Sequence, residues 1–190
     1  AVVRVGLGIC AFRLQKFDHA ELCLARALAL NGDDTLARMA MFAVQVRKRN
    51  LKLAAKHITA LYQSAPSAVV VQKFADVQFF KAVADGAVAA QEEFIAGLID
   101  STLAAADEAK DKKLGAYAKM QKARLHQALQ RNEEAKQLYT EAVAADPTLL
   151  TARIHLAEVQ YQLSGVEASL KALLSLQADA ASEKKATMMI

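Results

Sequence analysis

Six residues near the N-terminus, GLGICA from Gly6 to Ala11, have the G-x-G-x-x-A spacing of a loop that binds a dinucleotide pyrophosphate. In such a loop the glycines let the backbone approach the phosphates, which sit at the N-terminus of the next helix. A strand must precede the first glycine, and a second strand must end in an acidic residue about 20 positions later. The run up to Asn31 is instead helical in composition, and Asp33 and Asp34 follow no strand. We therefore expect no nucleotide site at these glycines.

The histidines offer no stronger candidate for chemistry. The chain has four of them, at His19, His57, His126 and His155. His155 and Glu158 stand three positions apart and could supply two metal ligands, but the sequence shows no third. It also contains no Ser/His/Asp signature, no P-loop and no metalloprotease helix. We expect no catalytic residue, no metal, no cofactor and no enzymatic activity.

The overall composition favours helices. The chain has 190 residues, of which 54% are hydrophobic, with only seven Gly and two Pro. Its net charge of +4 comes from interspersed charges of both signs. The sequence therefore shows no basic patch that would indicate direct nucleic-acid binding. No apolar run approaches the roughly 18 residues that a membrane-crossing helix needs, so we expect no membrane segment.

A repeat of about 34 residues organises these helices. The large and small residues that a tetratricopeptide repeat requires occur in the first period at Leu7, Gly8, Phe17, Ala20, Leu24, Ala27 and Leu28. They recur at Met41, Leu51, Ala54, Ile58 and Tyr62, and again at Ala123, Ala135, Tyr139, Ala142 and Val143. The small residues let helices approach closely, so Gly8 is a close-packing site and Gly6 a tolerated neighbour. The pattern predicts an all-α fold, a right-handed α-solenoid of about five tetratricopeptide-like helix pairs.

Two prolines predict where units end, because proline cannot continue a helix. Pro147 lies 81 positions after Pro66, about 13 more than two periods would need. The third unit therefore carries an insertion, which we place in or just after the second helix of that unit, around Leu103 to Lys113. We expect a single solenoid fragment over residues 1–190, with units of about 1–34, 35–68, 69–115 with the insertion, 116–149 and 150–183, and a tail at 184–190.

The first helix of each pair lines the concave face of such an array, so its variable positions predict the binding surface. They form an apolar groove with a basic edge, made of Val5, Ile9, Phe12, Arg13, Met39, Val46, Arg47, Val77, Phe80, Lys81 and Arg124. Farther along, the surface becomes more polar, at Tyr117, Met120, Gln127, Ile154, Glu158 and Tyr161. An exposed apolar strip needs a cover, which we expect to be a partner segment. Flanking repeats, a tail or self-association are the alternatives.

The first unit, VRVGLGICAFRLQKFDHAELCLARALALN, resembles the large tetratricopeptide scaffold subunit of the RNA polymerase II-associated factor (PAF) elongation complex. Units of that family run V-R-x-G-x-G-x-C-[FY], then a K-[LF]-[DE]-x-A turn and an R-A-L-x-L-N end. The resemblance implies a nuclear scaffold without enzymatic activity, which binds other subunits along its solenoid. On this basis Val5, Ile9, Phe12 and Phe80 would be contacts to those subunits.

The sequence thus predicts a protein-protein interaction scaffold whose partners are other protein subunits, with no small-molecule substrate. The first hypothesis places it in RNA polymerase II transcription elongation, in the nucleus by resemblance. The alternative is a tetratricopeptide adaptor of another assembly, in trafficking or in the bacterial envelope, and otherwise cytoplasmic.

Overall fold

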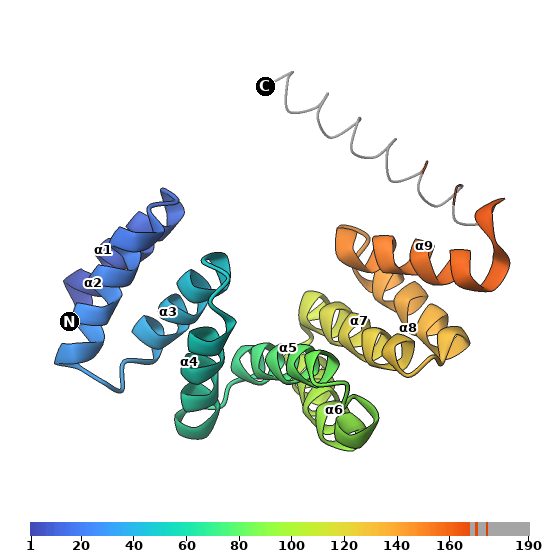
Figure 1. The fold of residues 1–190 in the computed structure, drawn as a ribbon, viewed down its shortest axis with the longest axis horizontal. Helices are drawn as coiled ribbons and strands as arrows, with labels where there is room; N and C mark the ends of the chain where they lie inside the picture. Colours follow the sequence, from blue (N-terminus) through green and yellow to red (C-terminus); the bar gives the residue numbers. More distant parts are fainter. Residues whose placement is uncertain (168–169, 171–173, 175–190) are drawn as a thin grey trace. The chain divides into compact units, whose positions relative to one another are not determined.

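The computed structural model describes residues 1–167, 170 and 174, and over these residues it contains helices and no strand (Figure 1). The helices are α1 (Val2–Arg13), α2 (Phe17–Leu30), α3 (Thr35–Arg47), α4 (Leu51–Ser64), α5 (Ala68–Ala84), α6 (Glu92–Ala109), α7 (Lys112–Ala128), α8 (Asn132–Ala145) and α9 (Leu150–Ser164), with a short 3₁₀ helix at Ala89–Gln91. The chain divides into two compact units, Ala1–Val77 and Gln78–Ile190, with the boundary inside α5. The predicted all-α class is confirmed.

In the first unit, consecutive helices form antiparallel pairs (Figure 1). Helix α1 packs on α2 and α3 on α4, while α3 also contacts both helices of the preceding pair. Alanines at the crossings let the helices approach closely, and Leu24, Met41 and Val44 fill the space between them. All three are buried. This alternation of small and large side chains is the reason the pairs stack.

The second unit repeats this arrangement. Helix α7 packs on α6 and α8, and α9 packs on α8 and touches α7. Tyr139 of α8 is fully buried, surrounded by Ala135, Ala142, Ala152 and Val159. One large side chain enclosed by small ones is again the packing unit.

The helix ends follow local chemistry. Helix α4 ends two residues before Pro66 and α8 two residues before Pro147, as the sequence predicted. The side chains of Asp34, Asn50 and Asp111 accept hydrogen bonds from backbone N–H groups in the first turns of α3, α4 and α7. Both kinds of signal were present in the sequence.

The turn inside each hairpin holds one residue in the left-handed backbone region: Gln15, Arg49, Gly86 and Gln130, with φ between 58° and 65°. In each turn the next N–H group donates to the carbonyl five residues before it, as Lys16 does to Ala11 at 2.9 Å. This closure satisfies a carbonyl at the helix end and reverses the chain. Three of the four positions are not glycine, so the positions of the glycines in the sequence did not predict these turns.

The third hairpin is longer than its neighbours, and part of the extra length lies in its second helix, α6, the helix in or just after which we placed the insertion. Helix α6 continues unbroken through Ala109, and only Lys110 and Asp111 separate it from α7. The added residues lie in the longer helices α5 and α6 and in the connection that contains the 3₁₀ helix. A longer helix keeps its backbone hydrogen bonds, which an extra loop would not. The second half of the fifth predicted unit and the tail at 184–190 lie outside the described residues, apart from residues 166, 167, 170 and 174.

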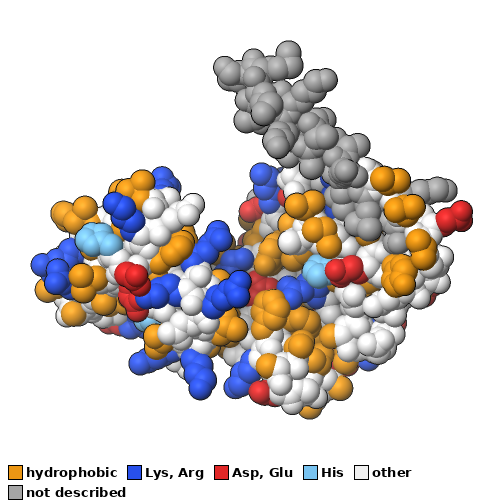
Figure 2. Space-filling view, turned by 45° about the horizontal axis from the view of Figure 1, so that its top comes forward, with side chains coloured by type: hydrophobic (Ala, Val, Ile, Leu, Met, Phe, Trp, Pro, Cys, Tyr) orange, Lys and Arg blue, Asp and Glu red, His pale blue; other side chains and the backbone are white. Residues whose placement is uncertain are grey.

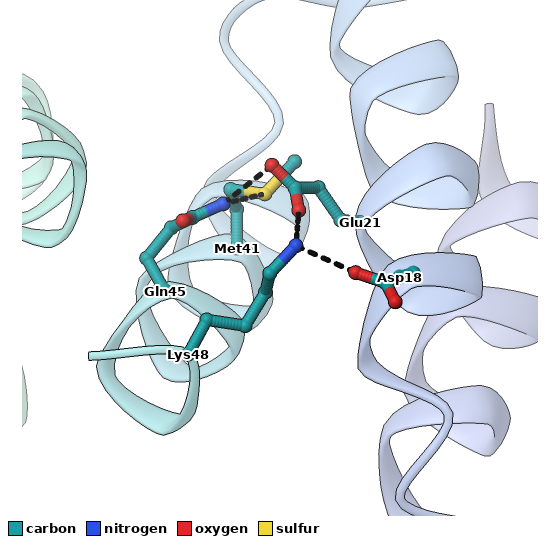
Figure 3. Close-up of polar contacts among 5 residues, drawn as sticks. All are labelled: Asp18, Glu21, Met41, Gln45 and Lys48. Atoms are coloured by element: carbon teal, nitrogen blue, oxygen red, sulfur yellow. Dashed lines mark hydrogen bonds and ion pairs between the residues drawn. The ribbon is translucent and has the colours of Figure 1, made fainter. Parts of the chain in front are cut away.

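A cluster of polar side chains joins α2 to α3 (Figure 3). Lys48 Nζ donates to Asp18 at 2.7 Å and to Glu21 at 2.5 Å. The second oxygen of Glu21 accepts from Gln45 Nε2 at 2.9 Å, and that amide also contacts Met41 Sδ. The hydrogen bonds from Lys48 lower the pKa of Asp18 and of Glu21 below their ordinary values of 3.8 and 4.5. The same two hydrogen bonds raise the pKa of Lys48 above its ordinary value of 10.5.

We expect Lys48→Met to lower the urea midpoint of unfolding at pH 7 and to have little effect at about pH 2. Carboxylates with lowered pKa values stabilise the fold above their ordinary pKa, and that contribution disappears as pH falls through the folded value. The pKa of Lys48 is raised, so its charge stabilises the fold below pH 10.5. This contribution is lost as the pH rises above 10.5 and Lys48 loses its proton. Lys52→Met, at an exposed lysine of α4, is the control and should change the midpoint little at either pH. An equal loss at pH 7 and pH 2 would contradict the charge-based explanation.

Candidate functional site

The glycine hexapeptide that resembles a phosphate loop lies entirely within α1. A Cβ atom added to Gly8 would lie 2.6 Å from Leu24 Cγ. A Cβ atom added to Gly6 would meet no neighbouring atom within 4 Å. Gly8 is therefore the close-packing site that the repeat predicts. A phosphate loop requires a strand-to-helix turn, and a continuous helix has none.

In the first hairpin the structure corrects the predicted groove. Val5 is only 3% exposed and packs in the core, so its assignment to a binding surface is wrong. Ile9 and Phe12 are half-buried against the same core, and the Phe12 ring meets Phe17 edge to face at 5.7 Å. The reason is that α1 is contacted by both α2 and α3, so more of its circumference is covered than the repeat pattern alone indicated.

The predicted basic edge has a structural explanation. Arg13, Arg47 and Lys81 are exposed and lie in the last turns of α1, α3 and α5. A cation there interacts favourably with the helix dipole, by about 0.3–1 kcal/mol. Their regular spacing therefore follows from the helix ends and needs no ligand. Of the other predicted residues, Val46 is exposed, and Met39 and Val77 are half-buried.

Two of the predicted residues do come together in the second unit. The guanidinium carbon of Arg124, on α7, lies 4.7 Å from the centre of the Phe80 ring and 4.9 Å from that of Phe79. The two rings, both on α5, meet edge to face at 5.8 Å. Phe80 remains half-exposed. Nothing in the sequence indicated that Phe80 and Arg124 are in contact, because they lie on different helices more than 40 positions apart.

A groove of about 660 Å³ lies between α7 and α9. Its lining residues are Gln127, Ile154, Ala157, Glu158, Tyr161, Gln162, Val166 and Leu170. Four of them were expected on this surface: Gln127, Ile154, Glu158 and Tyr161. Met120, expected beside them, is buried instead. Sequence reasoning missed the others.

Hydrogen bonds set the polar side of this groove. The Tyr139 hydroxyl donates to Gln127 Oε1 at 2.9 Å, and the Tyr139 ring stacks on His155 with centres 5.7 Å apart. His155 Nδ1 lies 2.8 Å from a carboxylate oxygen of Glu158. Burial raises the pKa of the Tyr139 phenol far above its ordinary 10, so it stays protonated and acts as a donor. A buried tyrosine thus orients the Gln127 amide at the groove.

Charged and apolar side chains are mixed on the face of the molecule that Figure 2 shows, where hydrophobic groups are interspersed with basic and acidic ones. In the described part of the chain, no group of three His, Cys, Asp or Glu side chains is placed to hold a metal ion. No helix within residues 1–167 is both long and apolar enough to cross a membrane.

A sequence model of the tetratricopeptide repeat matches residues 116–149, which contain most of α7 and all of α8. The chain contains a tetratricopeptide repeat. No curated protein sequence is significantly similar to the chain.

Solved structures of tetratricopeptide-repeat proteins share the fold. MamA from Desulfovibrio magneticus RS-1 has a TM-score of 0.70 at 13% identity, over 95% of this chain and 94% of that one. A thermophilic repeat protein from Thermus thermophilus has a TM-score of 0.58 at 20% identity, over 94% of this chain and 96% of that one. YrrB, described as having an unusual peptide-binding site, has a TM-score of 0.62 at 14% identity, over 96% of this chain and 90% of that one. At these identities the likeness concerns the fold alone.

Proposed function

We propose that this repeat protein is an adaptor that binds a segment of a partner protein in the groove between α7 and α9. The observation that carries the proposal is the groove itself, where Ile154 and Tyr161 expose apolar surface beside the oriented amide of Gln127. Binding sites for extended segments combine apolar pockets with a few fixed polar groups. The structural likeness to YrrB, which has a peptide-binding site, supports the same class of ligand.

A library of random linear peptides, displayed on phage and selected on the whole chain, tests this proposal. We expect enriched peptides that bind saturably, and we expect Tyr161→Glu to weaken them at least about tenfold, because the charge would be desolvated in the groove. Tyr161 is 57% exposed, so the variant should keep its helical content by circular dichroism. Leu51→Glu, at a comparably exposed apolar residue of α4, is the control and should bind normally. Peptides that bind both variants equally would place the site elsewhere.

A narrower form of the proposal concerns the assembly in which the adaptor works. The resemblance of the first unit to the PAF-complex scaffold supports a nuclear role in RNA polymerase II elongation. The alternative, an adaptor of another assembly, has support from the bacterial repeat proteins with the same fold, including PilF of Pseudomonas aeruginosa. Affinity purification from cells separates the two: recovery of polymerase and elongation subunits supports the first, and recovery of envelope or transport proteins without them supports the second.

A further inference from the structure

One charge dominates the groove between α7 and α9. Among the described residues that line it, Glu158 is the only charged side chain. The other polar groups of the lining, on Gln127, Tyr161 and Gln162, are neutral, and the remaining lining residues are apolar. A carboxylate in such surroundings attracts cations and disfavours anions. The charge of the groove therefore favours a partner segment with a basic side chain.

Glu158 can accept further hydrogen bonds beyond the contact that it already makes. Its Oε2 atom lies 2.8 Å from Nδ1 of His155, one turn earlier on the same helix. A carboxylate has about four lone-pair positions on its two oxygens, and this contact occupies one of them. The Glu158 side chain is 53% exposed. A cationic side chain of a ligand can thus reach the carboxylate.

Arg124 of α7 is engaged elsewhere. Its guanidinium lies over the rings of Phe79 and Phe80 and has further partners in the structure. It is not among the residues that line the groove. A segment in the groove therefore meets Glu158 as the charged side chain of the site.

Apolar surface lies on the same face of α9 as Glu158. Ile154 precedes Glu158 by four positions and Tyr161 follows it by three, and these spacings make side chains neighbours on a helix. Ile154 is 38% exposed and Tyr161 is 57% exposed. Ala157 lies between these two on the same face, where its short side chain leaves room for an apolar group of a ligand. The acid is thus flanked by apolar surface on both sides.

The spacing along α9 suits an extended chain. Four residues of a helix rise about 6 Å. Alternate residues of an extended chain lie on the same side and about 6.7 Å apart. Two side chains of a ligand that are two positions apart can therefore reach Glu158 and its apolar neighbours together.

We propose that the groove selects an extended segment in which a Lys or Arg side chain pairs with Glu158 and a large apolar side chain two positions away packs on Ile154 or Tyr161. The amide nitrogen of Gln127 can donate to a backbone carbonyl of this segment, because its amide oxygen already accepts from the Tyr139 hydroxyl. The inference rests on the proposed peptide-binding function and adds to it the chemistry of the partner.

The peptides selected from the phage library test the inference. We expect them to be enriched in Lys or Arg two positions from Leu, Ile, Phe or Met. Changing the basic residue of one such peptide to Gln should weaken binding to the original chain about fivefold, the effect of losing a partly exposed ion pair. Binding of the basic peptide to Glu158→Gln should be weaker by the same factor. The Gln peptide should lose nothing more on this variant, because the two groups act as a pair.

Two further variants separate this pairing from a general effect of charge. Glu108→Gln, at an exposed glutamate of α6 that does not line the groove, changes the net charge equally and should leave binding unchanged. Glu158→Lys reverses the charge, and we expect it to bind a peptide with Glu in place of the basic residue more tightly than the basic peptide. Thermal unfolding of both Glu158 variants checks that the fold survives the loss of the His155 contact.

The outcomes distinguish the inference from the proposed function. If selected peptides need Tyr161 but bind equally with the basic residue and with Gln, the basic preference is wrong and the adaptor proposal stands. If Glu158→Gln weakens both peptides alike, the pairing with Glu158 is wrong. If no peptide binds in a Tyr161-dependent way, the inference and the proposed function are both wrong.

Discussion

Tyr139→Ala is expected to lower the free energy of unfolding by about 3–5 kcal/mol, the usual cost of truncating a buried aromatic side chain. The Tyr139 ring has no exposed surface, stacks on His155, and is enclosed by alanines that cannot expand to fill the cavity. Urea unfolding followed by circular dichroism measures the change. Tyr139→Phe separates the ring from the hydroxyl, since it should cost only about 1 kcal/mol for the lost hydrogen bond to Gln127.

Tyr161→Ala is the matched control, a tyrosine of the same unit that differs in burial. Its side chain is more than half exposed in the groove, so the free energy of unfolding should change by no more than about 0.5 kcal/mol. Peptide binding should weaken, because the apolar wall loses its largest residue. Equal destabilisation by the two alanine substitutions would contradict the separation of the core from the groove.

Gly8→Ala and Gly6→Ala are expected to change stability in opposite directions. At Gly8 the new methyl group would lie 2.6 Å from Leu24 Cγ and 2.8 Å from its Cδ2, and Leu24 has no exposed surface into which to move. Overpacking of this kind costs about 1–3 kcal/mol. At Gly6 the methyl group would meet open space, so the higher helix propensity of alanine should stabilise by about 0.5–1 kcal/mol.

Thermal and urea unfolding of the two alanine variants give the measurement, with the unsubstituted chain as the reference. The two substitutions are chemically identical and two positions apart on one helix, which makes each the control for the other. A stabilising Gly8→Ala would show that α1 and α2 do not approach as closely as the structure places them.

The helical class could be predicted from the sequence because each repeat carries its own local signals. Small residues such as Gly8 and Ala20 recur at fixed spacing, and Pro66 and Pro147 end helices through the geometry of their rings. The turn residues could not be found in this way. Gln15, Arg49 and Gln130 adopt a left-handed backbone that their side chains do not favour, and a closing hydrogen bond stabilises each turn.

The groove was predicted only in part, for a different physical reason. Repeat position indicates which helix face is turned inward, and three residues expected on that face, Gln127, Ile154 and Tyr161, line one groove. It could not tell that Val5 is covered, because burial depends on how many neighbouring helices reach that face. Nor could it bring Phe80 and Arg124 into contact.

The sequence by itself therefore determined the elements of this protein: its helices, their ends at the prolines and their repeated close-packing residues, all of which depend on interactions within one or two turns. Only the tertiary structure decided which side chains line the groove between α7 and α9. Whether Arg124 lies over the Phe79 and Phe80 rings, and whether Tyr139 orients Gln127, depends on the packing of separate helices, which residue spacing along one helix does not contain.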